Sequence, residues 1–420
     1  MKTNDLHIAL PTSKSLSNRW LMLNHLLGRP FTLRNLSDSD DTALLQTLLA
    51  QLRRGSTREF FCGNAGTVAR FMMALLAVTP GEWSLDGDER MRRRPMSPLI
   101  DALRSMGSHI QCLGEEGFLP VAITGHVPEH KMVEIDPSES SQFVSALLLV
   151  GPLFPQGLTL TLTDRPASRP YIDMTMNVLQ RAGITTSVSP NRRVYRVAPL
   201  TSLPSVVHSN ITIERDWSSA AYIYAAAALL PHHRMRMQGL SLTGSCQGDK
   251  VAAEIFDRLG VVTREVRSPY RKDIRSITVE GSGTHENAID YNFIDCPDLM
   301  PPVLVTCAAL GVKARLKGVK NLSIKECDRL LVLSQELGKM GCRVSRTENE
   351  IRIFPGTNSR TLKQKDIQID VHNDHRMAMS FGILTLLYPG IEILNPASVT
   401  KSFPGFWEQM KLIQDYQTAN

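Results

Sequence analysis

Six stretches of the chain repeat one order of apolar and polar positions. Each stretch opens at a small, polar or proline residue and then stays apolar or alanine-rich for about three turns, as a capped, buried helix would. The openings lie near Ser17, Gly66, Ser140, Ser218, Pro297 and Asp374. They are 49, 74, 78, 79 and 77 residues apart, which predicts six units with a first unit short by 74 − 49 = 25 residues.

A strand pattern follows each predicted helix. Apolar and polar residues alternate in Leu158 to Leu162 and in Val194 to Val197, as is typical of half-buried strands. The strands expected after the six helices cover residues 31–35, 83–86, 158–162, 234–238, 314–317 and 391–394. A second helix completes a unit and ends at a glycine in four of them: Gly107, Gly183, Gly260 and Gly341.

This order of elements predicts an α/β fold with more than one domain. The period exceeds the roughly 20 to 50 residues of the common solenoid repeats, so we expect a closed arrangement of three units in each of two domains. The length of 420 residues agrees, because one hydrophobic core seldom organises so long a chain.

Composition and charge exclude several classes of protein. Charged residues are 21% and hydrophobic residues 42% of the chain, which excludes a disordered or collagen-like protein. The net charge of +6 suits anionic substrates but is too small for a nucleic-acid coat. The longest strongly apolar run, Ala220 to Leu230, is shorter than the ~20 residues that span a bilayer. Seven scattered cysteines without a C-x-x-C pair, and no apolar core for a signal peptide in Met1 to Ser17, indicate a cytoplasmic protein.

The predicted helix openings carry groups that bind anions. A helix N-terminus presents unpaired N–H groups and about half a positive charge. A single Ser or Asn there is most simply a cap, but six such openings on one face would form an anion-attracting cleft. The loops after the strands add full charges at Arg94, Lys325, Arg329 and Lys401. The sequence therefore predicts substrates that carry phosphate and carboxylate groups.

Two acidic residues, Asp298 and Glu326, lie among these cations. Nearby Lys and Arg lower the pKa of a carboxyl group unless burial opposes them, and such groups can transfer protons. Glu326 could instead only form an ion pair with Arg329 at helical spacing. His372 and His375 lie in one turn without a second cluster, so we expect no metal, and no Walker or dinucleotide-binding motif indicates a cofactor.

Eleven stretches of the chain occur in the order found in one enzyme family. They are LPTSKSLSNR, LSDSDD, GNAGTVAR, ERMRRRP, SSQFVSALL, SRPYIDM, DWSSAAY, QGDK, IKECDR, NDHRMAM and TKSFPGFWEQ. From Leu10 to about Met410 the chain thus resembles the 5-enolpyruvylshikimate-3-phosphate synthase family, the 3-phosphoshikimate 1-carboxyvinyltransferases.

The resemblance implies two domains, each an inside-out α/β barrel of three βαβαββ units with helices inside. It places one domain at residues 13–213 and the second at residues 1–12 plus 214–420. It also implies that the domains close around the two substrates, and that the enzyme acts as a monomer without a metal or an organic cofactor.

The resemblance further implies a role for each motif residue. Shikimate 3-phosphate would contact Lys14, Ser15, Arg19, Ser140, Ser141, Gln142, Ser168, Tyr171, Asp298, Asn321 and Lys325. Phosphoenolpyruvate would contact Lys14, Asn64, Gly66, Arg94, Gln142, Arg329, Arg376 and Lys401. Asp298 would accept the proton of the attacking 5-hydroxyl, Glu326 would transfer the C3 proton, and Lys14 and Lys401 would stabilise charge.

Three departures from the family pattern leave other functions open. Few residues separate Leu49 from Asn64, Thr12 stands where many members have Gly, and Trp217 replaces a small residue. The alternatives are the sister family that uses UDP-N-acetylglucosamine as acceptor, or a non-catalytic ligand-binding member. The region around Cys112 does not resemble the reactive-cysteine loop of the sister family, and all the acids and cations that catalysis needs are present.

Overall fold

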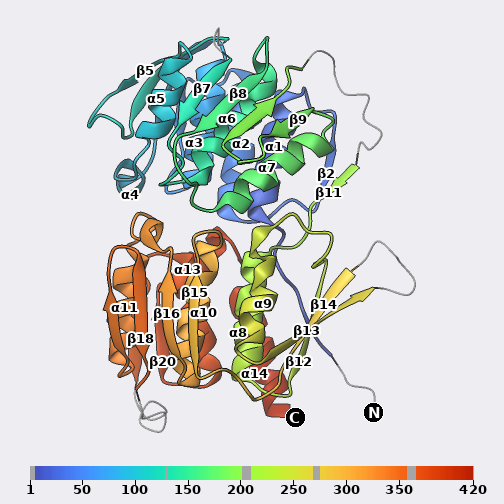
Figure 1. Cartoon of the computed structure of the whole chain (residues 1–420), viewed down its shortest axis with the longest axis vertical. Coiled ribbons are helices and arrows are strands. Elements are labelled where there is room, and N and C mark those ends of the chain that lie inside the picture. Colours follow the sequence, from blue (N-terminus) through green and yellow to red (C-terminus); the bar gives the residue numbers. More distant parts are fainter. Residues whose placement is uncertain (1–4, 128–130, 201–209, 268–274, 357–365, 420) are drawn as a thin grey trace. The chain divides into compact units, whose positions relative to one another are not determined.

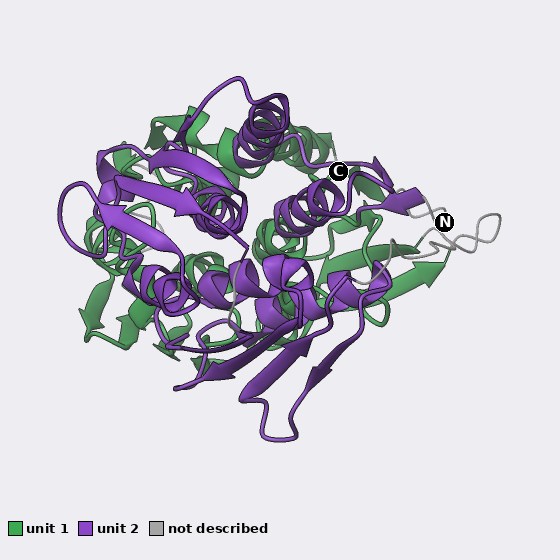
Figure 2. Ribbon diagram, turned by 90° about the horizontal axis from the view of Figure 1, so that it is seen from above, with its two compact units in different colours: residues 1–13, 214–420 green, residues 14–213 purple. Residues whose placement is uncertain are grey.

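The chain divides into two compact units (Figure 2). The computed structural model describes residues 5–127, 131–200, 210–267, 275–356 and 366–419. Unit 1 consists of Met1–Ser13 and Glu214–Asn420, and unit 2 is Lys14–Ile213. The chain passes from unit 1 to unit 2 between Ser13 and Lys14, and back to unit 1 between Ile213 and Glu214.

Unit 2 contains two complete repeats with the order βαβαββ, in which two parallel strands flank a buried helix and an antiparallel hairpin follows. The first comprises β3 (Glu59–Phe61), α3 (Gly66–Val78), β4 (Gly81–Asp86), α4 (Glu89–Arg92), α5 (Ser97–Ser105), β5 (His109–Cys112) and β6 (Val121–Gly125). The second comprises β7 (Met132–Ile135), α6 (Ser141–Val150), η1 (Gly151–Leu153), β8 (Leu158–Leu162), α7 (Arg169–Arg181), β9 (Thr186–Val188) and β10 (Val194–Val197). The strand orders are β3-β4-β6-β5 and β7-β8-β10-β9.

The remaining repeat of unit 2 is short, as predicted. It comprises α1 (Lys14–Leu26), β2 (Thr32–Arg34), α2 (Asp40–Arg54) and β11 (Asn210–Thr212). Its sheet has two strands, because the chain turns at Gly55 in the left-handed conformation (φ 63°) and enters β3 without forming a closing hairpin.

Unit 1 also has two complete repeats and one two-stranded repeat (Figure 1). The first comprises β1 (Leu6–Ile8), α8 (Trp217–Leu229), β12 (Arg234–Gln238), η2 (Gly248–Val251), α9 (Ala252–Asp257), β13 (Val261–Arg267) and β14 (Arg275–Gly281). The second comprises β15 (Ala288–Asn292), η3 (Pro297–Leu299), α10 (Met300–Leu310), β16 (Lys313–Lys317), η4 (Lys320–Leu322), α11 (Arg329–Lys339), β17 (Arg343–Arg346) and β18 (Glu350–Phe354). The third comprises β19 (Ile367–Asp370), α13 (His375–Gly382), η5 (Ile383–Leu386), β20 (Ile391–Leu394), η6 (Pro396–Lys401) and α14 (Phe406–Ala419).

Each unit completes one sheet with a strand from a distant part of the sequence. In unit 1, β1 pairs in parallel with β12, with Leu6 opposite Met235. In unit 2, β11 pairs in parallel with β2, with Ile211 opposite Leu33. Unit 1 is therefore discontinuous in sequence because a strand near the N-terminus belongs to its first sheet.

The expectation of a closed barrel is wrong. In each unit the described strands form three separate sheets, and hydrogen bonding stops at their edge strands. The sheets do not join because the strands of each repeat pair with one another, as β4 does with β3 and β6. The centre holds helices, as the inside-out description implies.

The central helices are buried on nearly every side. Every residue of α8 is buried, α3 is buried except at Thr67, and α6 is buried except at Gln142. Side-chain burial of this kind requires an apolar sequence around the whole helix, which is the pattern that marked the six stretches. The less buried positions of α3 and α6 lie in their first turns, so the helix N-termini are the places where ligands can reach the unit.

The predicted strands agree with the structure. Residues 158–162, 194–197, 234–238 and 391–394 form strands with the expected bounds, and the other three differ by at most two residues at an end. The expected starts near Ser17 and Ser218 lie inside their helices, because α1 begins at Lys14 and α8 at Trp217. No helix in the described ranges is long and apolar enough to cross a membrane.

Candidate active site

The predicted site residues lie at helix N-termini and in the adjoining turns of each unit. Unit 2 carries Lys14, Ser15, Arg19, Asn64, Gly66, Arg94, Ser140, Ser141, Gln142, Ser168 and Tyr171. Unit 1 carries Asp298, Asn321, Lys325, Glu326, Arg329, Arg376 and Lys401. Each unit thus contributes its own group of side chains.

Lys14 begins α1 and is held by an acidic residue of α2. Its Nζ lies 2.8 Å from Oδ2 of Asp41, and both side chains are largely buried. Asp41 belongs to the LSDSDD stretch, yet the sequence reasoning assigned it no role. The ion pair orients the ammonium group and partly offsets the cost of burying it.

Arg19 is a buried cation that joins three helices of unit 2. Its guanidinium donates to the carbonyl oxygens of Ser15 (2.9 Å) and Tyr171 (3.1 Å), to Thr175 Oγ1 (2.8 Å) and to Ser145 Oγ (3.1 Å). It also lies 5.8 Å from the centre of the Tyr171 ring. These contacts fix the first turns of α1 and α7, so Arg19 positions Ser15 and Tyr171.

Two guanidinium groups converge on the N-terminus of α3. A Cβ atom built at Gly66 would lie 2.6 Å from Nη2 of Arg94 and 2.6 Å from Nη1 of Arg70. Nε and Nη1 of Arg94 are buried and donate no hydrogen bond to any described residue. A buried cation without hydrogen-bond partners is costly, so this turn is suited to an anionic ligand that would supply them.

Gln142 links the first turns of α3 and α6. Its Oε1 accepts from Arg70 Nη1 at 2.8 Å, and its Nε2 donates to Thr67 Oγ1 at 3.0 Å. Ser140 caps α6 by accepting from the Gln142 N–H at 3.2 Å. Arg70 was not among the predicted residues, although its i+4 position after Gly66 places it on the same helix face.

The remaining predicted residues of unit 2 flank these turns. Ser141 is the first residue of α6 and is buried, and Asn64 lies in the turn before α3. Ser168 precedes α7 in the left-handed conformation with φ 58°, which a non-glycine residue adopts only under constraint, and its side chain makes no cap hydrogen bond. Ser168 and Tyr171 therefore lie at one rigid helix start.

In unit 1, the buried Arg329 contacts three acidic residues. Its Nε lies 2.8 Å from Asp374 Oδ2, its Nη2 2.9 Å from Glu326 Oε2, and its Nη1 3.3 Å from Asp298 Oδ1. Burial lowers the pKa of Arg329, but the negative charges of Asp374, Glu326 and Asp298 outweigh it and raise that pKa overall. Arg329 is therefore a permanent cation, and its ion pair with Glu326 is part of a larger network.

Asp298 lies between two guanidinium groups. Its Oδ2 is 2.7 Å from Nη2 of Arg376, and its Oδ1 faces Arg329. Burial acts to raise the pKa of Asp298, but Arg376, Lys325 and Arg329 together lower it to about 2. In this state Asp298 is ionised and a weak base.

Glu326 is paired on both of its oxygens. Oε2 faces Arg329, and Oε1 lies 3.2 Å from Nζ of Lys401 on η6. Lys325 immediately precedes it, and Asn321 is buried on η4. The structure thus brings the two predicted acids and three predicted cations of unit 1 into one network.

Asp374 organises this network, and the sequence reasoning saw it only as a helix start. It caps α13 by accepting from the N–H groups of Arg376 (2.8 Å) and Met377 (3.4 Å), and it also accepts from Arg329 and from Cys327 Sγ. Asp374 lies four residues after the end of β19, and its place in NDHRMAM marks a cap, but only the fold brings Arg329 to it.

The two histidines do not form a metal site. His372 is half exposed, whereas His375 is buried within α13. Among the residues that the structure describes, no three His, Cys, Asp or Glu side chains gather where they could hold a metal ion.

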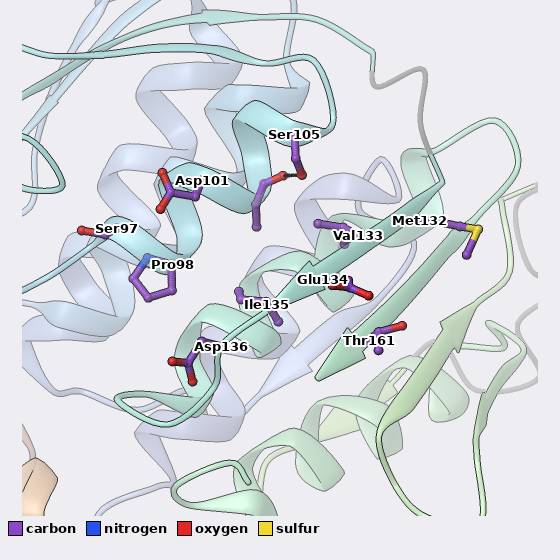
Figure 3. Close-up of a pocket in the computed structure, with 11 residues that line it drawn as sticks. Ser97, Pro98, Asp101, Ser105, Met132, Val133, Glu134, Ile135, Asp136 and Thr161 are labelled. Carbon is purple, nitrogen blue, oxygen red and sulfur yellow. Dashed lines mark hydrogen bonds between the residues drawn. The ribbon is translucent and has the colours of Figure 1, made fainter. Parts of the chain in front are cut away.

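A cavity of about 760 Å³ in unit 2 lies away from these residues (Figure 3). It is lined by α5 and the edge strand β7, with Asp101, Glu134 and Asp136 among its polar side chains. None of the predicted substrate-binding residues lines it. Its acidic lining is unsuited to phosphate or carboxylate ligands.

Comparison with known proteins identifies related sequences of similar length. The chain matches the family model described as EPSP synthase (3-phosphoshikimate 1-carboxyvinyltransferase) over residues 4–410. The 3-phosphoshikimate 1-carboxyvinyltransferase of Bacteroides fragilis (strain YCH46) is 38% identical over 405 residues, which cover 96% of this chain and 94% of the relative. That of Syntrophobacter fumaroxidans is 32% identical over 426 residues, covering 97% and 96%.

Solved structures share the fold. An EPSP synthase from Acinetobacter baumannii superimposes with a TM-score of 0.72 at 22% identity, covering 96% of this chain and 94% of that one. The enolpyruvyl transferase NikO from Streptomyces tendae superimposes with a TM-score of 0.68 at 14% identity, covering 97% and 94%. At these identities the likeness concerns the fold alone.

Proposed function

Because the chain belongs to the EPSP synthase (3-phosphoshikimate 1-carboxyvinyltransferase) family, we propose that it transfers the enolpyruvyl group of phosphoenolpyruvate to the 5-hydroxyl of shikimate 3-phosphate and releases phosphate. The observation that carries this proposal is the network of unit 1, in which Asp298 is held by Arg376 and Arg329. An anionic substrate that binds the guanidinium groups of Arg376 and Arg329 would replace Asp298 as their partner. Asp298 would then be free to act as a base next to the substrate.

Unit 2 supplies most of the groups proposed to hold shikimate 3-phosphate. Hydroxyl groups and N–H groups at the starts of α1, α6 and α7 suit a phosphate and a polyol, and Tyr171 offers a ring face. The residues concerned are Lys14, Ser15, Arg19, Ser140, Ser141, Gln142, Ser168 and Tyr171, together with Asp298, Asn321 and Lys325 of unit 1.

Phosphoenolpyruvate needs cations for both its phosphate and its carboxylate. Arg94, with its unused N–H groups beside Gly66, is suited to the phosphate, and unit 2 also carries Asn64 before α3, Gln142 on α6 and Lys14 at the start of α1. Arg329, Arg376 and Lys401 of unit 1 are suited to the carboxylate. Planar guanidinium groups bind carboxylates through two parallel hydrogen bonds, which favours Arg at these positions.

Proton transfer follows from the loss of the ion pairs of Asp298. When a substrate carboxylate takes over Arg376 and Arg329, the charges that lower the pKa of Asp298 are shared with the ligand, and its basicity rises. Asp298 then accepts the proton of the 5-hydroxyl as the hydroxyl oxygen bonds to C2. C3 takes a proton from Glu326, which first receives that proton from Lys401 Nζ, 3.2 Å from its Oε1. Phosphate leaves from C2, C3 returns its proton to Glu326, and Lys14 and Lys401 stabilise the changing charges.

Phosphate release tests the proposal and distinguishes the acceptors. We expect release from phosphoenolpyruvate to require shikimate 3-phosphate and to be absent with UDP-N-acetylglucosamine. Release only with UDP-N-acetylglucosamine would assign the chain to that reaction, and binding of both substrates without release would indicate a non-catalytic protein.

We further propose that the enzyme works as a cytoplasmic monomer. Support comes from the cysteines, all seven of which are free in the structure, as expected in a reducing compartment. Sedimentation of the active enzyme at assay concentration tests the monomeric state, and a larger active species would contradict it.

A further inference from the structure

A second buried carboxyl group lies near Asp298 in unit 1, and the mechanism above does not use it. Asp249 belongs to η2 and is 3% exposed. Both η2, which carries Asp249, and η3, which carries Asp298, pack against α8. Two carboxyl groups thus approach the same helix from separate elements of the chain.

The side chain of Asp249 has one hydrogen-bonded oxygen and one that is not. Ser218 Oγ donates to Oδ2, whereas Oδ1 is buried and accepts no hydrogen bond from the residues that the structure describes. The neighbouring Gln247 accepts from the Trp217 N–H (3.1 Å) and donates to the Arg215 carbonyl oxygen (2.7 Å). These bonds hold η2 against the start of α8, where the side chain of Asp249 is buried.

The groups that interact with Asp249 come from three elements and the residues just before two of them. They are Asp298 on η3 and Cys296 before it, Ser218 on α8 and Asp216 before it, and Arg376 on α13. Burial and the negative charge of Asp298 raise the pKa of Asp249 to about 7, against the opposing effects of Ser218 and Arg376. Asp249 therefore changes its charge near neutral pH, where most carboxyl groups stay ionised.

We propose that Asp249 is a positioning residue whose charge sets the basicity of Asp298. The inference rests on the proposed function, in which Asp298 accepts the hydroxyl proton. When Asp249 is ionised, its repulsion makes Asp298 bind a proton more tightly, so Asp298 is a better acceptor. When Asp249 is neutral, Asp298 is a weaker acceptor, and kcat should therefore rise with pH as Asp249 loses its proton.

The substitution Asp249→Asn tests this directly, because it removes the charge and keeps an oxygen that can accept from Ser218. We expect kcat at pH 8 to fall roughly threefold to tenfold, as for a loss of up to one unit in the pKa of Asp298. The rise in kcat near pH 7 should disappear, and KM for phosphoenolpyruvate should stay the same or fall, because a negative charge near Arg376 is lost. If kcat of the variant still rose near pH 7 as it does in the wild type, the proposal would be wrong. A higher KM together with a lower kcat at every pH would also overturn it.

Two further variants complete the test. Ser218→Ala removes a hydrogen bond that favours the ionised form of Asp249, so the rise in kcat should move to higher pH. If the rise stayed at the same pH, the proposal would be wrong. This test remains available even if Asp249→Asn does not fold. Asp257→Asn makes the same charge change at an exposed position of α9 and should leave the pH profile as in the wild type.

Thermal unfolding separates this inference from the proposed function. The raised pKa means that Asp249 opposes folding increasingly as pH rises from about 4 towards 7. Asp249→Asn should therefore gain in Tm relative to the wild type between pH 5 and pH 8. If the difference in Tm between Asp249→Asn and the wild type did not change with pH, the inference would be wrong, whether or not the protein is active. If Tm rose as expected but the wild type had no transferase activity, only the proposed function would be wrong.

Discussion

The two units treat their charged side chains in different ways. In unit 2, Arg94 is buried with N–H groups that no described residue accepts from, and its guanidinium lies at the start of α3 beside a second guanidinium, that of Arg70. In unit 1, Arg329 and Arg376 are already paired with Asp298, and Lys401 is paired with Glu326. Under the proposed function, an anion would bind the unused N–H groups of Arg94 in unit 2, whereas in unit 1 the substrate would replace Asp298 as the partner of Arg329 and Arg376.

This difference teaches how one repeated architecture supports two tasks. An unpaired cation gains hydrogen bonds when a ligand binds and contributes affinity. A paired cation gains less from the ligand, but the exchange releases a carboxylate whose proton affinity then rises. Under the proposed function, unit 2 therefore contributes mainly to binding, whereas unit 1 contributes to both binding and proton transfer.

The largest expected effect comes from removing Asp298, the proposed general base in unit 1. Asp298→Asn should lower kcat by about 10²- to 10⁴-fold, the usual contribution of a general base, and leave substrate binding within a few-fold. Steady-state kinetics and calorimetric binding of both substrates would measure this. The control is Asp290→Asn, which changes an exposed acid of β15 and should leave kcat unchanged; near-wild-type turnover in Asp298→Asn would exclude Asp298 as the base.

The matching substitution in unit 2 should affect binding instead. Arg94→Ala removes the guanidinium with unused N–H groups, and we expect KM for phosphoenolpyruvate to rise about 10- to 100-fold, because a hydrogen bond to a charged group contributes about 1.5–3 kcal/mol. The control is Arg93→Ala, which removes the adjacent but exposed cation that pairs with Glu89. If Arg94→Ala lowered kcat with KM unchanged, the contrast between the units would be wrong.

A smaller change at the same turn sharpens the assignment. In Gly66→Ala the added Cβ would lie 2.6 Å from Arg94 Nη2, so the guanidinium must move away from its anion. We expect KM for phosphoenolpyruvate to increase roughly tenfold and KM for shikimate 3-phosphate to increase less. Gly338→Ala in α11 has open space around its Cβ and should leave both KM values unchanged; equal losses in the two variants would point to a general effect on folding.

The smallest effect concerns acid stability. The pKa of Asp298 is lowered to about 2, so its ion pairs stabilise the folded chain above pH 4, and this contribution is lost as pH falls towards 2. The lowered pKa predicts that about 2 kcal/mol of the free energy of unfolding is lost over that range. The difference in Tm between wild type and Asp298→Asn should shrink from pH 5 to pH 3, and a difference independent of pH would contradict the lowered pKa.

The repeat and its local elements could be predicted from the sequence, because they depend on neighbouring residues. An apolar, alanine-rich run after Asp374 or Ser140 can bury all sides of a helix, and alternation in Leu158 to Leu162 can bury one face of a strand. The absence of a closing hairpin from the first repeat could likewise be predicted, because the helix openings near Ser17 and Gly66 are closer together than the other openings. These features are set by the order of residues alone.

Other features depend on contacts between distant residues, and only the tertiary structure decided them. Asp374 meets Arg329 across 45 positions, and Arg70 meets Gln142 across 72, with no local pattern that marks either pair. The same holds for Asp249, whose burial near Asp298 follows from the packing of η2 and η3 on α8. The sequence by itself determined which residues carry charge and where helices begin, whereas the fold decided which charges are paired, because pairing and burial depend on distance in space.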